Sequence, residues 1–303
     1  MRRDLQRVVR GKRIASVQVK TPKILRAPDG GRLKSGAPFT RRLRGQVISK
    51  VGRRGKLLIF DLHQQGTQTF LLVHLKMTGQ LIYRDGRRTV AGGHGWPLHR
   101  PAFAKATAGK QGSEGQAQLP GKFTHVVITF SGGGKMFFND LRQFGFLRVV
   151  DKPTLAAILG AYGPEPLSRT FTPEYLQTVL RGRGTALKNI LLNQALIAGL
   201  GNIYVDESCF RAGVRPGRRA SRVSGAEVVR LHRTIQHVLR AALKERGTTF
   251  GSFRDGLGGE GNFVRFLKVY GRSGELCKKC RRALIARTVV AGRGTAYCPV
   301  CQR

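Results

Sequence analysis

Acidic residues are scarce in this chain. Its 303 residues include 16 aspartates and glutamates against 55 lysines and arginines, which gives a formal net charge of +39. This imbalance argues against a merely solvated surface and favours a polyanionic partner. Because lysines and arginines release counterions when they neutralise phosphates, we expect a nucleic-acid ligand whose binding weakens as salt rises.

Long hydrophobic runs are missing as well. The apolar runs at 57–60 and 70–73 have the length of strands, which excludes a membrane-spanning helix and predicts no membrane partner. Hydrophobic residues nevertheless make up 41% of the chain, enough to bury real cores. Together with the length, this composition suggests two domains plus a small module.

Cysteine is rare, but four of the 5 cysteines form two CxxC pairs: Cys277, Cys280, Cys298 and Cys301. Two such pairs present four thiolates to a tetrahedral Zn²⁺, so the spacing predicts a zinc ribbon with one structural zinc ion. Two disulfides are the alternative, but no secretory signal precedes the chain, and CxxC pairs more often bind metal in a cytosolic setting. The fifth cysteine, Cys209, is interpreted as a small buried hydrophobe.

The segment between the cysteine pairs contains a candidate phosphate ligand. Residues 288–297 are expected to form two short strands joined by a glycine-rich turn, which places Arg293 between two glycines. A turn braced by Zn²⁺ holds an arginine rigidly enough to clamp a phosphate.

The first part of the chain, residues 1–150, favours strands. Short β-branched or aromatic runs lie between glycine-rich breaks at 13–20, 46–50, 56–62, 69–75, 125–130, 135–138 and 145–150. This pattern predicts a β-sandwich domain over 1–150, with an amphipathic helix at 1–9. Two stretches, 26–40 and 85–122, lack periodicity, and the second is expected to be a disordered insertion.

Helical periodicity begins near residue 151. Thr172 caps a helix with proline at its first position, and Ser224 with Glu227 forms a capping box for a long helix that ends near Gly247. The chain is therefore predicted to be an α+β protein. A linker at 151–165 would lead to a helical domain at 166–262 and a zinc finger at 263–303.

Several separate segments then point to one family. They are 55–58, 74–79, 139–145, 163–167, 187–188, 198–207, 247–249, 269–271, and 292–294 with its cysteines. In this order, they resemble the formamidopyrimidine-DNA glycosylase and endonuclease VIII family of base-excision repair enzymes. The resemblance implies that the helical domain is a helix-two-turn-helix module.

The resemblance implies DNA-binding roles for His74, Met77, Arg142, Phe144, Lys188 and Asn202. Met77, Arg142 and Phe144 match side chains that fill the gap left by a flipped-out nucleotide and so offset part of the unstacking cost. Asn202 matches a phosphate-contacting asparagine at a helix start. Taken alone, Met77 and Phe144 would more often be core residues, and residues 199–202 could be an ordinary helix-ending loop.

The resemblance also implies catalytic roles for Lys56 and Arg293. Lys56 would contact phosphate near the lesion and assist elimination, and Arg293 would contact DNA beside the damaged nucleoside. Family members begin with proline and glutamate after the initiator methionine, whereas this chain begins Met1-Arg-Arg-Asp-Leu. The matching segment, whose proline amine attacks the sugar C1′, is expected upstream of Met1.

The leading hypothesis is a monomeric, zinc-containing DNA glycosylase with AP lyase activity. It would remove 8-oxoguanine and formamidopyrimidines from damaged double-stranded DNA, in the cytoplasm at the nucleoid. One alternative is a catalytically inactive damaged-DNA-binding protein of the same fold. Another is a basic RNA-binding zinc ribbon, which would not account for residues 140–145 or 199–202.

Overall fold

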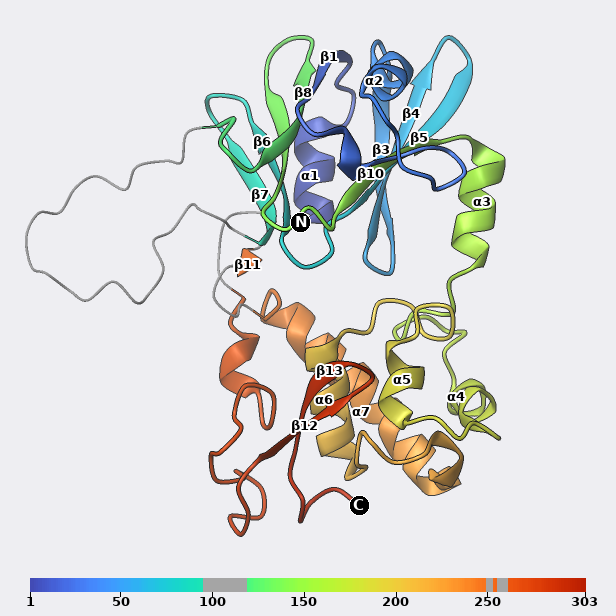
Figure 1. Ribbon diagram of the computed structural model, residues 1–303, viewed down its shortest axis with the longest axis vertical. Helices are drawn as coiled ribbons and strands as arrows, with labels where there is room; N and C mark the ends of the chain where they lie inside the picture. Colours follow the sequence, from blue (N-terminus) through green and yellow to red (C-terminus); the bar gives the residue numbers. More distant parts are fainter. Residues whose placement is uncertain (95–118, 249–252, 255–260) are drawn as a thin grey trace, which may run out of the picture. The chain divides into compact units, whose positions relative to one another are not determined.

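The computed structural model describes residues 1–94, 119–248, 253–254 and 261–303. Contacts within the chain divide it into two compact units (Figure 1). The first unit runs from Met1 to Ala157 and includes residues 253–254, and the second contains 158–248 and 262–303. The predicted zinc finger therefore packs within the second unit.

The first unit is built on two sheets. One is six-stranded, in the order β1 (Ile14–Val19), β8 (Thr124–Phe130), β9 (Lys135–Asp140), β6 (Gly79–Arg84), β7 (Thr89–His94) and β11 (Phe253–Arg254). The other is five-stranded, in the order β2 (Leu25–Arg26), β10 (Phe146–Val150), β5 (Thr67–His74), β4 (Leu57–Gln64) and β3 (Val47–Arg54). Except for β2 against β10, neighbouring strands pair antiparallel.

One hydrophobic cluster joins the inner faces of these sheets. Phe60 on β4 and Phe138 on β9 both belong to it, so the predicted β-sandwich is confirmed. The amphipathic helix α1 (Arg2–Val9), also predicted, buries Leu5 and Val9 in the same cluster.

The pattern of short strands missed several elements. Helix α2 (Ala37–Leu43) lies inside the aperiodic stretch 26–40, where Phe39 and Leu43 supply its buried side. Strand β6 was not predicted. Strand β7, which lies within the predicted insertion 85–122, was missed because Gly92 and Gly93 interrupt its alternation. Residues 95–118 of that insertion lie outside the described residues.

The second unit is mainly helical. Its longer helices are α4 (Pro173–Leu180), α5 (Leu187–Leu192), α6 (Asn202–Ala212) and α7 (Gly225–Lys244), with short 3₁₀ turns at Ala220–Arg222 and Phe263–Phe266. Thr172 accepts a hydrogen bond from the Tyr175 amide, and the Ser224–Glu227 capping box is present, as predicted. The predicted linker 151–165 contains a further helix, α3 (Lys152–Gly160), and a 3₁₀ turn in the first unit spans Pro22–Ile24.

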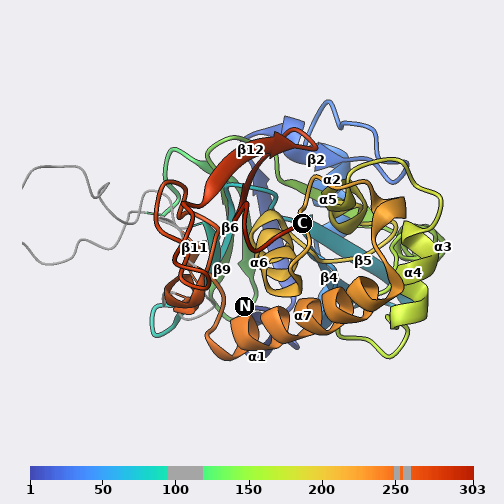
Figure 2. The ribbon, with the colours of Figure 1, turned by 90° about the horizontal axis from the view of Figure 1, so that it is seen from below.

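Helix α6 is the centre of the second unit, and α7 packs across it (Figure 2). Its Glu207 carboxylate is fully buried and accepts hydrogen bonds from the backbone amides of Lys268, Val269 and Tyr270. This contact ties the segment before the cysteines to the helical core. Strands β12 (Ala286–Val290) and β13 (Arg293–Tyr297) follow as the predicted hairpin.

Within the residues that the structure describes, none of the helices combines the length and the apolar character that crossing a membrane requires.

Candidate nucleic-acid interface

The four cysteines of the two CxxC pairs converge on one point. Their Sγ atoms all lie within 4.8 Å of one another, with 3.9 Å between Cys277 and Cys301 and 3.7 Å between Cys280 and Cys298. Four sulfurs at about 2.3 Å from a tetrahedral Zn²⁺ are about 3.8 Å apart, so this cage fits the ion. The predicted zinc site is thereby supported by geometry as well as by spacing.

The hairpin beside the cysteines presents Arg293. Ala291 and Gly292 form a two-residue turn in which both have positive φ, 57° and 66°. Arg293 is exposed and is the first residue of β13, paired with Val290. The predicted turn is therefore one residue earlier than expected, and Arg293 lies where a strand fixes its backbone.

A buried ion pair fastens this hairpin to the helices. The Lys188 ammonium donates to Asp206 at 2.6 Å, to the Thr295 hydroxyl at 2.8 Å and to the Gly294 carbonyl at 3.2 Å. Lys188 and Asp206 are both fully buried. Burial raises the pKa of Asp206 to about 6 and lowers that of Lys188, and their mutual attraction opposes both shifts.

Lys188 was predicted to contact DNA, but its ammonium donates all three hydrogens inside the protein. Its contacts serve instead to hold the backbone that follows Arg293.

Asn202 contacts the hairpin at the same carbonyl as Lys188, that of Gly294. It is the first residue of α6, and its side-chain amide donates to the Gly294 carbonyl at 3.0 Å. Gly201 precedes it as the N-cap residue in extended backbone. The opening amides of α6 point out of the helix start, where an anion is favoured. One hydrogen bond thus places this helix start beside the Arg293 hairpin.

In the first unit, three connections meet at one end of the strands. The turn after β3 contains Lys56, the turn after β5 contains Met77, and the loop after β9 contains Arg142 and Phe144. His74, the last residue of β5, pairs in register with Leu57 and with Phe146 on the neighbouring strands. Antiparallel pairing therefore brings residues from distant parts of the sequence to the same end of the strands.

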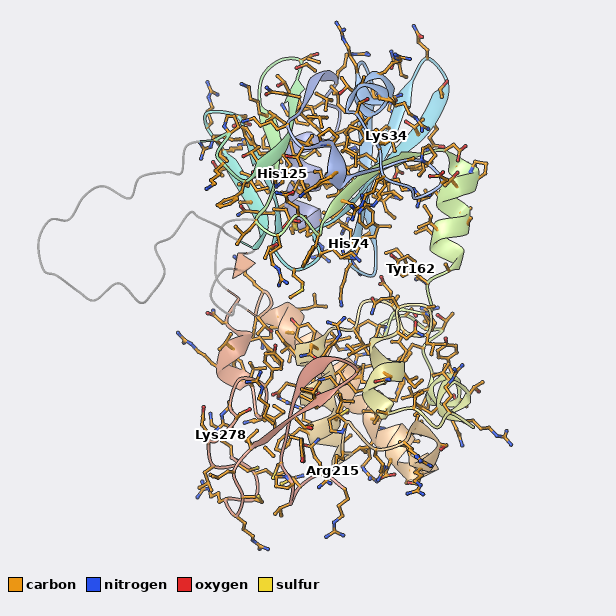
Figure 3. All side chains as sticks on the ribbon, viewed as in Figure 1. Lys34, His74, His125, Tyr162, Arg215 and Lys278 are labelled. Carbon is orange, nitrogen blue, oxygen red and sulfur yellow. The ribbon has the colours of Figure 1, made fainter. Side chains whose placement is uncertain are left out.

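His74 is held as a neutral ring at this end of the strands (Figure 3). Its ring stacks on Phe146 with centroids 5.6 Å apart, and Nδ1 accepts the Lys76 amide at 2.9 Å. Burial lowers the pKa of His74 to about 4, and the charges of Lys76 and Lys56 act in the same direction. With Nδ1 accepting, the neutral ring carries its proton on Nε2 as a donor.

Met77, Arg142 and Phe144 form one exposed cluster. The Arg142 guanidinium lies 4.6 Å from the centre of the Phe144 ring, and its Nη1 is 3.8 Å from the Met77 sulfur. Met77 is 54% exposed and Phe144 49% exposed, so neither is a core residue. An exposed cluster of two apolar side chains and a flat cation is unusual for a solvated turn and suits stacking against bases.

Asp140 organises the loop that carries this cluster. It is fully buried, and its carboxylate accepts from the Thr78 hydroxyl and from the amides of Arg142 and Gly145. The buried His125 donates through Nε2 to the Asp140 carbonyl at 2.7 Å (Figure 3). Asp140 lies in the motif 139–145, but neither residue was singled out from the sequence, because burial was not visible there.

Gly145 closes the same loop tightly. A Cβ at this position would lie 2.8 Å from the Phe138 ring and 2.9 Å from the His74 carbonyl. A larger residue would therefore displace the loop, which explains why glycine follows Phe144 here.

Comparisons with known proteins agree with this geometry. Residues 1–147 match the model of the formamidopyrimidine-DNA glycosylase N-terminal domain, and 162–253 match its H2TH domain. Residues 271–303 match the zinc finger found in FPG and IleRS. A formamidopyrimidine-DNA glycosylase of Pelotomaculum thermopropionicum is 37% identical, covering 100% of this chain and 96% of the relative. That of Symbiobacterium thermophilum is 39% identical, covering 100% and 86%.

Solved structures give the same result. The complex of Lactococcus lactis Fpg with DNA containing an abasic site has a TM-score of 0.78 at 29% identity, covering 100% of this chain and 96% of that one. A mutant of the same protein with DNA containing Fapy-dG has a TM-score of 0.77 at 28% identity, with the same coverage.

The fold, the cysteine cage and the exposed cluster thus define a zinc-containing DNA repair glycosylase class. Within it, the chain belongs to the formamidopyrimidine-DNA glycosylase family. The α+β fold class, the helix-two-turn-helix domain and the single structural zinc predicted from the sequence are confirmed.

Proposed function

We propose that this protein excises oxidised purines, such as 8-oxoguanine and formamidopyrimidines, from double-stranded DNA and cleaves the resulting abasic site by β- and δ-elimination. The observation that carries the proposal is the exposed cluster of Met77, Arg142 and Phe144. In the solved complexes, relatives with this fold are bound to DNA containing an abasic site or Fapy-dG.

The cluster supplies what base removal requires. Turning a nucleotide out of the duplex costs a few kcal/mol of stacking and pairing, about the amount that inserted side chains can offset. Met77 and Phe144 offer apolar surface, and Arg142, stacked on Phe144, adds a planar cation that can also donate hydrogen bonds to the unpaired opposite base. The stack keeps all three in one orientation before DNA arrives.

Phosphate contacts come from both units. In the first, Lys56 supplies a cation next to His74, whose neutral ring donates through Nε2. In the second, the start of α6 at Asn202 and the guanidinium of Arg293 supply a helix-end site and a clamp. We assign Lys188 to positioning Arg293, because its three donors are used inside the protein.

The covalent step follows the family chemistry. In that chemistry, the amine of an N-terminal proline, which the printed sequence does not contain, attacks C1′ and the damaged base leaves with a proton. The resulting Schiff base then eliminates the 3′ and the 5′ phosphate. Lys56 and Arg293 assist by stabilising the departing phosphates. The zinc ion is structural and holds the hairpin. We further propose that the protein acts as a monomer at the nucleoid.

Borohydride trapping on abasic duplex tests this proposal. Two forms are compared, the chain as printed and the chain extended at Met1 by a segment that begins with proline and glutamate. We expect the extended form to give a covalent adduct and to release 8-oxoguanine. If it binds abasic duplex but forms no adduct, the activity is rejected in favour of a damaged-DNA-binding protein of the same fold.

A further inference from the structure

A cavity of about 420 Å³ lies in the second unit, next to the hairpin. Its walls include Arg215, Arg218, Thr288, Val290, Tyr297 and Arg303. Arg215 and Arg218 belong to the loop after α6, and Thr288, Val290 and Tyr297 belong to β12 and β13 (Figure 3). The size is within the range of small-molecule sites, which span roughly 300–1,000 Å³.

The cavity is strongly basic. Three of its lining residues, Arg215, Arg218 and Arg303, carry permanent positive charges. Glu227 neutralises one of them, through an ion pair with Nη2 of Arg218. The carboxylate of Arg303, the last residue of the printed chain, offsets a second of these charges, and the guanidinium of Arg215 leaves the hollow positively charged, which favours an anion.

Arg218 adds a second, independent indication. Its Nη1 donates to the Arg303 carbonyl at 3.1 Å and its Nη2 to Glu227, which fixes the guanidinium plane. Its Nε is buried and has no hydrogen-bond partner among the described residues. A buried N–H without an acceptor is costly, and an anion in the hollow would offset part of that cost through the charge of the guanidinium.

Another part of the cavity wall suits a flat ring. The Arg215 guanidinium lies 5.1 Å from the centre of the Tyr297 ring, and Val290 contributes apolar surface close by. Thr288 offers a hydroxyl that can donate or accept. Cation, aromatic face and hydroxyl together match the planar base and sugar of a nucleoside.

We propose that this cavity is a nucleotide-binding site, in which the arginines hold the phosphate and the Tyr297–Val290 wall contacts the base. The nucleotide is either a free nucleoside phosphate or the phosphorylated end of a nucleic-acid strand. The site is distinct from the residues assigned to lesion recognition, so it goes beyond the proposed function.

Calorimetric titration of the zinc-loaded full chain tests the site without lesion DNA. The probes are AMP, adenosine, inorganic phosphate, and a short single strand with and without a 5′-phosphate. We expect saturable binding of AMP or of the 5′-phosphorylated strand, and weaker binding of the probes that lack either base or phosphate. AMP binding identifies a free nucleotide as the ligand, and binding of the phosphorylated strand alone identifies a strand end.

Matched variants separate this site from the general positive charge. Arg215→Gln and Arg303→Gln should each weaken binding by about tenfold, the effect of losing one charge-assisted contact. Arg219→Gln removes the same charge from an exposed neighbour that does not line the cavity, and should leave binding unchanged. Arg218→Lys keeps the charge but loses the planar group that Glu227 and Arg303 hold in place, and should also weaken binding.

Two outcomes would overturn the proposal. One is an equal loss in Arg219→Gln and Arg215→Gln, which would assign binding to the overall charge. The other is the absence of saturable binding by every phosphorylated probe. Zinc content and the melting temperature show that each variant is folded, and if Arg218→Lys is not, the other two variants decide. None of these results depends on glycosylase activity.

Discussion

At the residue scale, Asp140 decides where Arg142 and Phe144 lie. Its buried carboxylate accepts hydrogen bonds from both sides of the loop that holds Arg142 and Phe144. In Asp140→Asn, the side chain keeps its shape, but the charge that strengthens these bonds is lost. We expect affinity for abasic duplex to fall about tenfold, as measured by fluorescence anisotropy.

The control for this change is Asp29→Asn, which removes the same charge from an exposed turn of the same unit. Both variants gain equally in overall positive charge, so electrostatic attraction to DNA changes in parallel. If Asp29→Asn weakens binding as much as Asp140→Asn, the positioning role of Asp140 is wrong.

His74 gives the stability of the protein a defined pH dependence. Its pKa lies near 4 in the folded chain and near 6.5 in an unfolded one, so the unfolded state binds the proton more readily. The contribution of His74 is therefore undiminished above pH 6.5 and declines as the pH falls toward 4. His74→Gln should lose less stability across this window than the parent, in urea titrations at matched salt. Identical pH profiles would contradict the assignment of His74 as a half-buried neutral ring.

The sequence predicted the members of the site better than their surroundings. Met77, Arg142 and Phe144 were assigned by resemblance, and the structure brings them together. The setting of Lys188 could not be read in the same way, because its partners lie 18 and 107 residues further along the chain. Burial is a property of the assembled fold, so the local sequence around Lys188 does not show that its ammonium is buried in a hydrogen-bond network.

At the scale of elements, the Lys188–Asp206 pair connects α5 and α6 to the Arg293 hairpin. Asp206→Asn leaves the buried ammonium without a counter-charge, which should cost about 3–5 kcal/mol of stability in the second unit. Lys188→Met in the Asp206→Asn background should recover most of that loss, because no buried charge remains. Denaturant titrations, in which the release of zinc reports unfolding, measure both the loss in Asp206→Asn and its recovery in the double variant.

The pair between the exposed Arg230 and the half-buried Glu227, whose nitrogen and oxygen are 4.0 Å apart, is the reference for this experiment. Arg230→Gln should cost less than about 1 kcal/mol, as surface ion pairs do. A loss of that small size in Asp206→Asn would show that the buried pair does not hold the hairpin.

The zinc cage holds the β12–β13 hairpin at the end away from its turn. Cys277 and Cys298 pack in a small apolar cluster with Phe210 of α6, so the metal joins the hairpin to the helical core. Zinc binding contributes about 10–16 kcal/mol in finger peptides. Cys298→Ser should therefore lower zinc content and expose the hairpin amides to hydrogen exchange. Cys209→Ala, which alters a buried cysteine outside the cage, should retain its zinc by elemental analysis. Full zinc in Cys298→Ser would exclude the site.

Elements with strong local signals were predictable, and those without were not. Thr172 and the Ser224–Glu227 box marked the starts of α4 and α7 because capping is decided within a few residues. Strand β7 was missed because its glycines carry no alternation, and it is a strand because it pairs with β6 and β11. Its register is therefore set by tertiary contacts, which single-sequence patterns do not contain.

At the scale of the whole molecule, charge and recognition must be separated. A net charge of +39 predicts tight, salt-sensitive binding to any duplex, so total affinity says little about function. What distinguishes a repair glycosylase is the extra affinity for a site where a base is damaged or absent. We propose that this difference comes from the Met77–Arg142–Phe144 cluster, and that the bulk affinity is spread over the surface.

The most direct test is therefore the ratio of affinities for abasic and intact duplexes of the same sequence at one salt concentration, in the parent and in Arg142→Ala. The account predicts that the parent prefers the abasic duplex and that Arg142→Ala loses most of this preference while binding intact duplex almost as well. Equal affinity of the parent for both duplexes, or an equal loss on both in the variant, would contradict it.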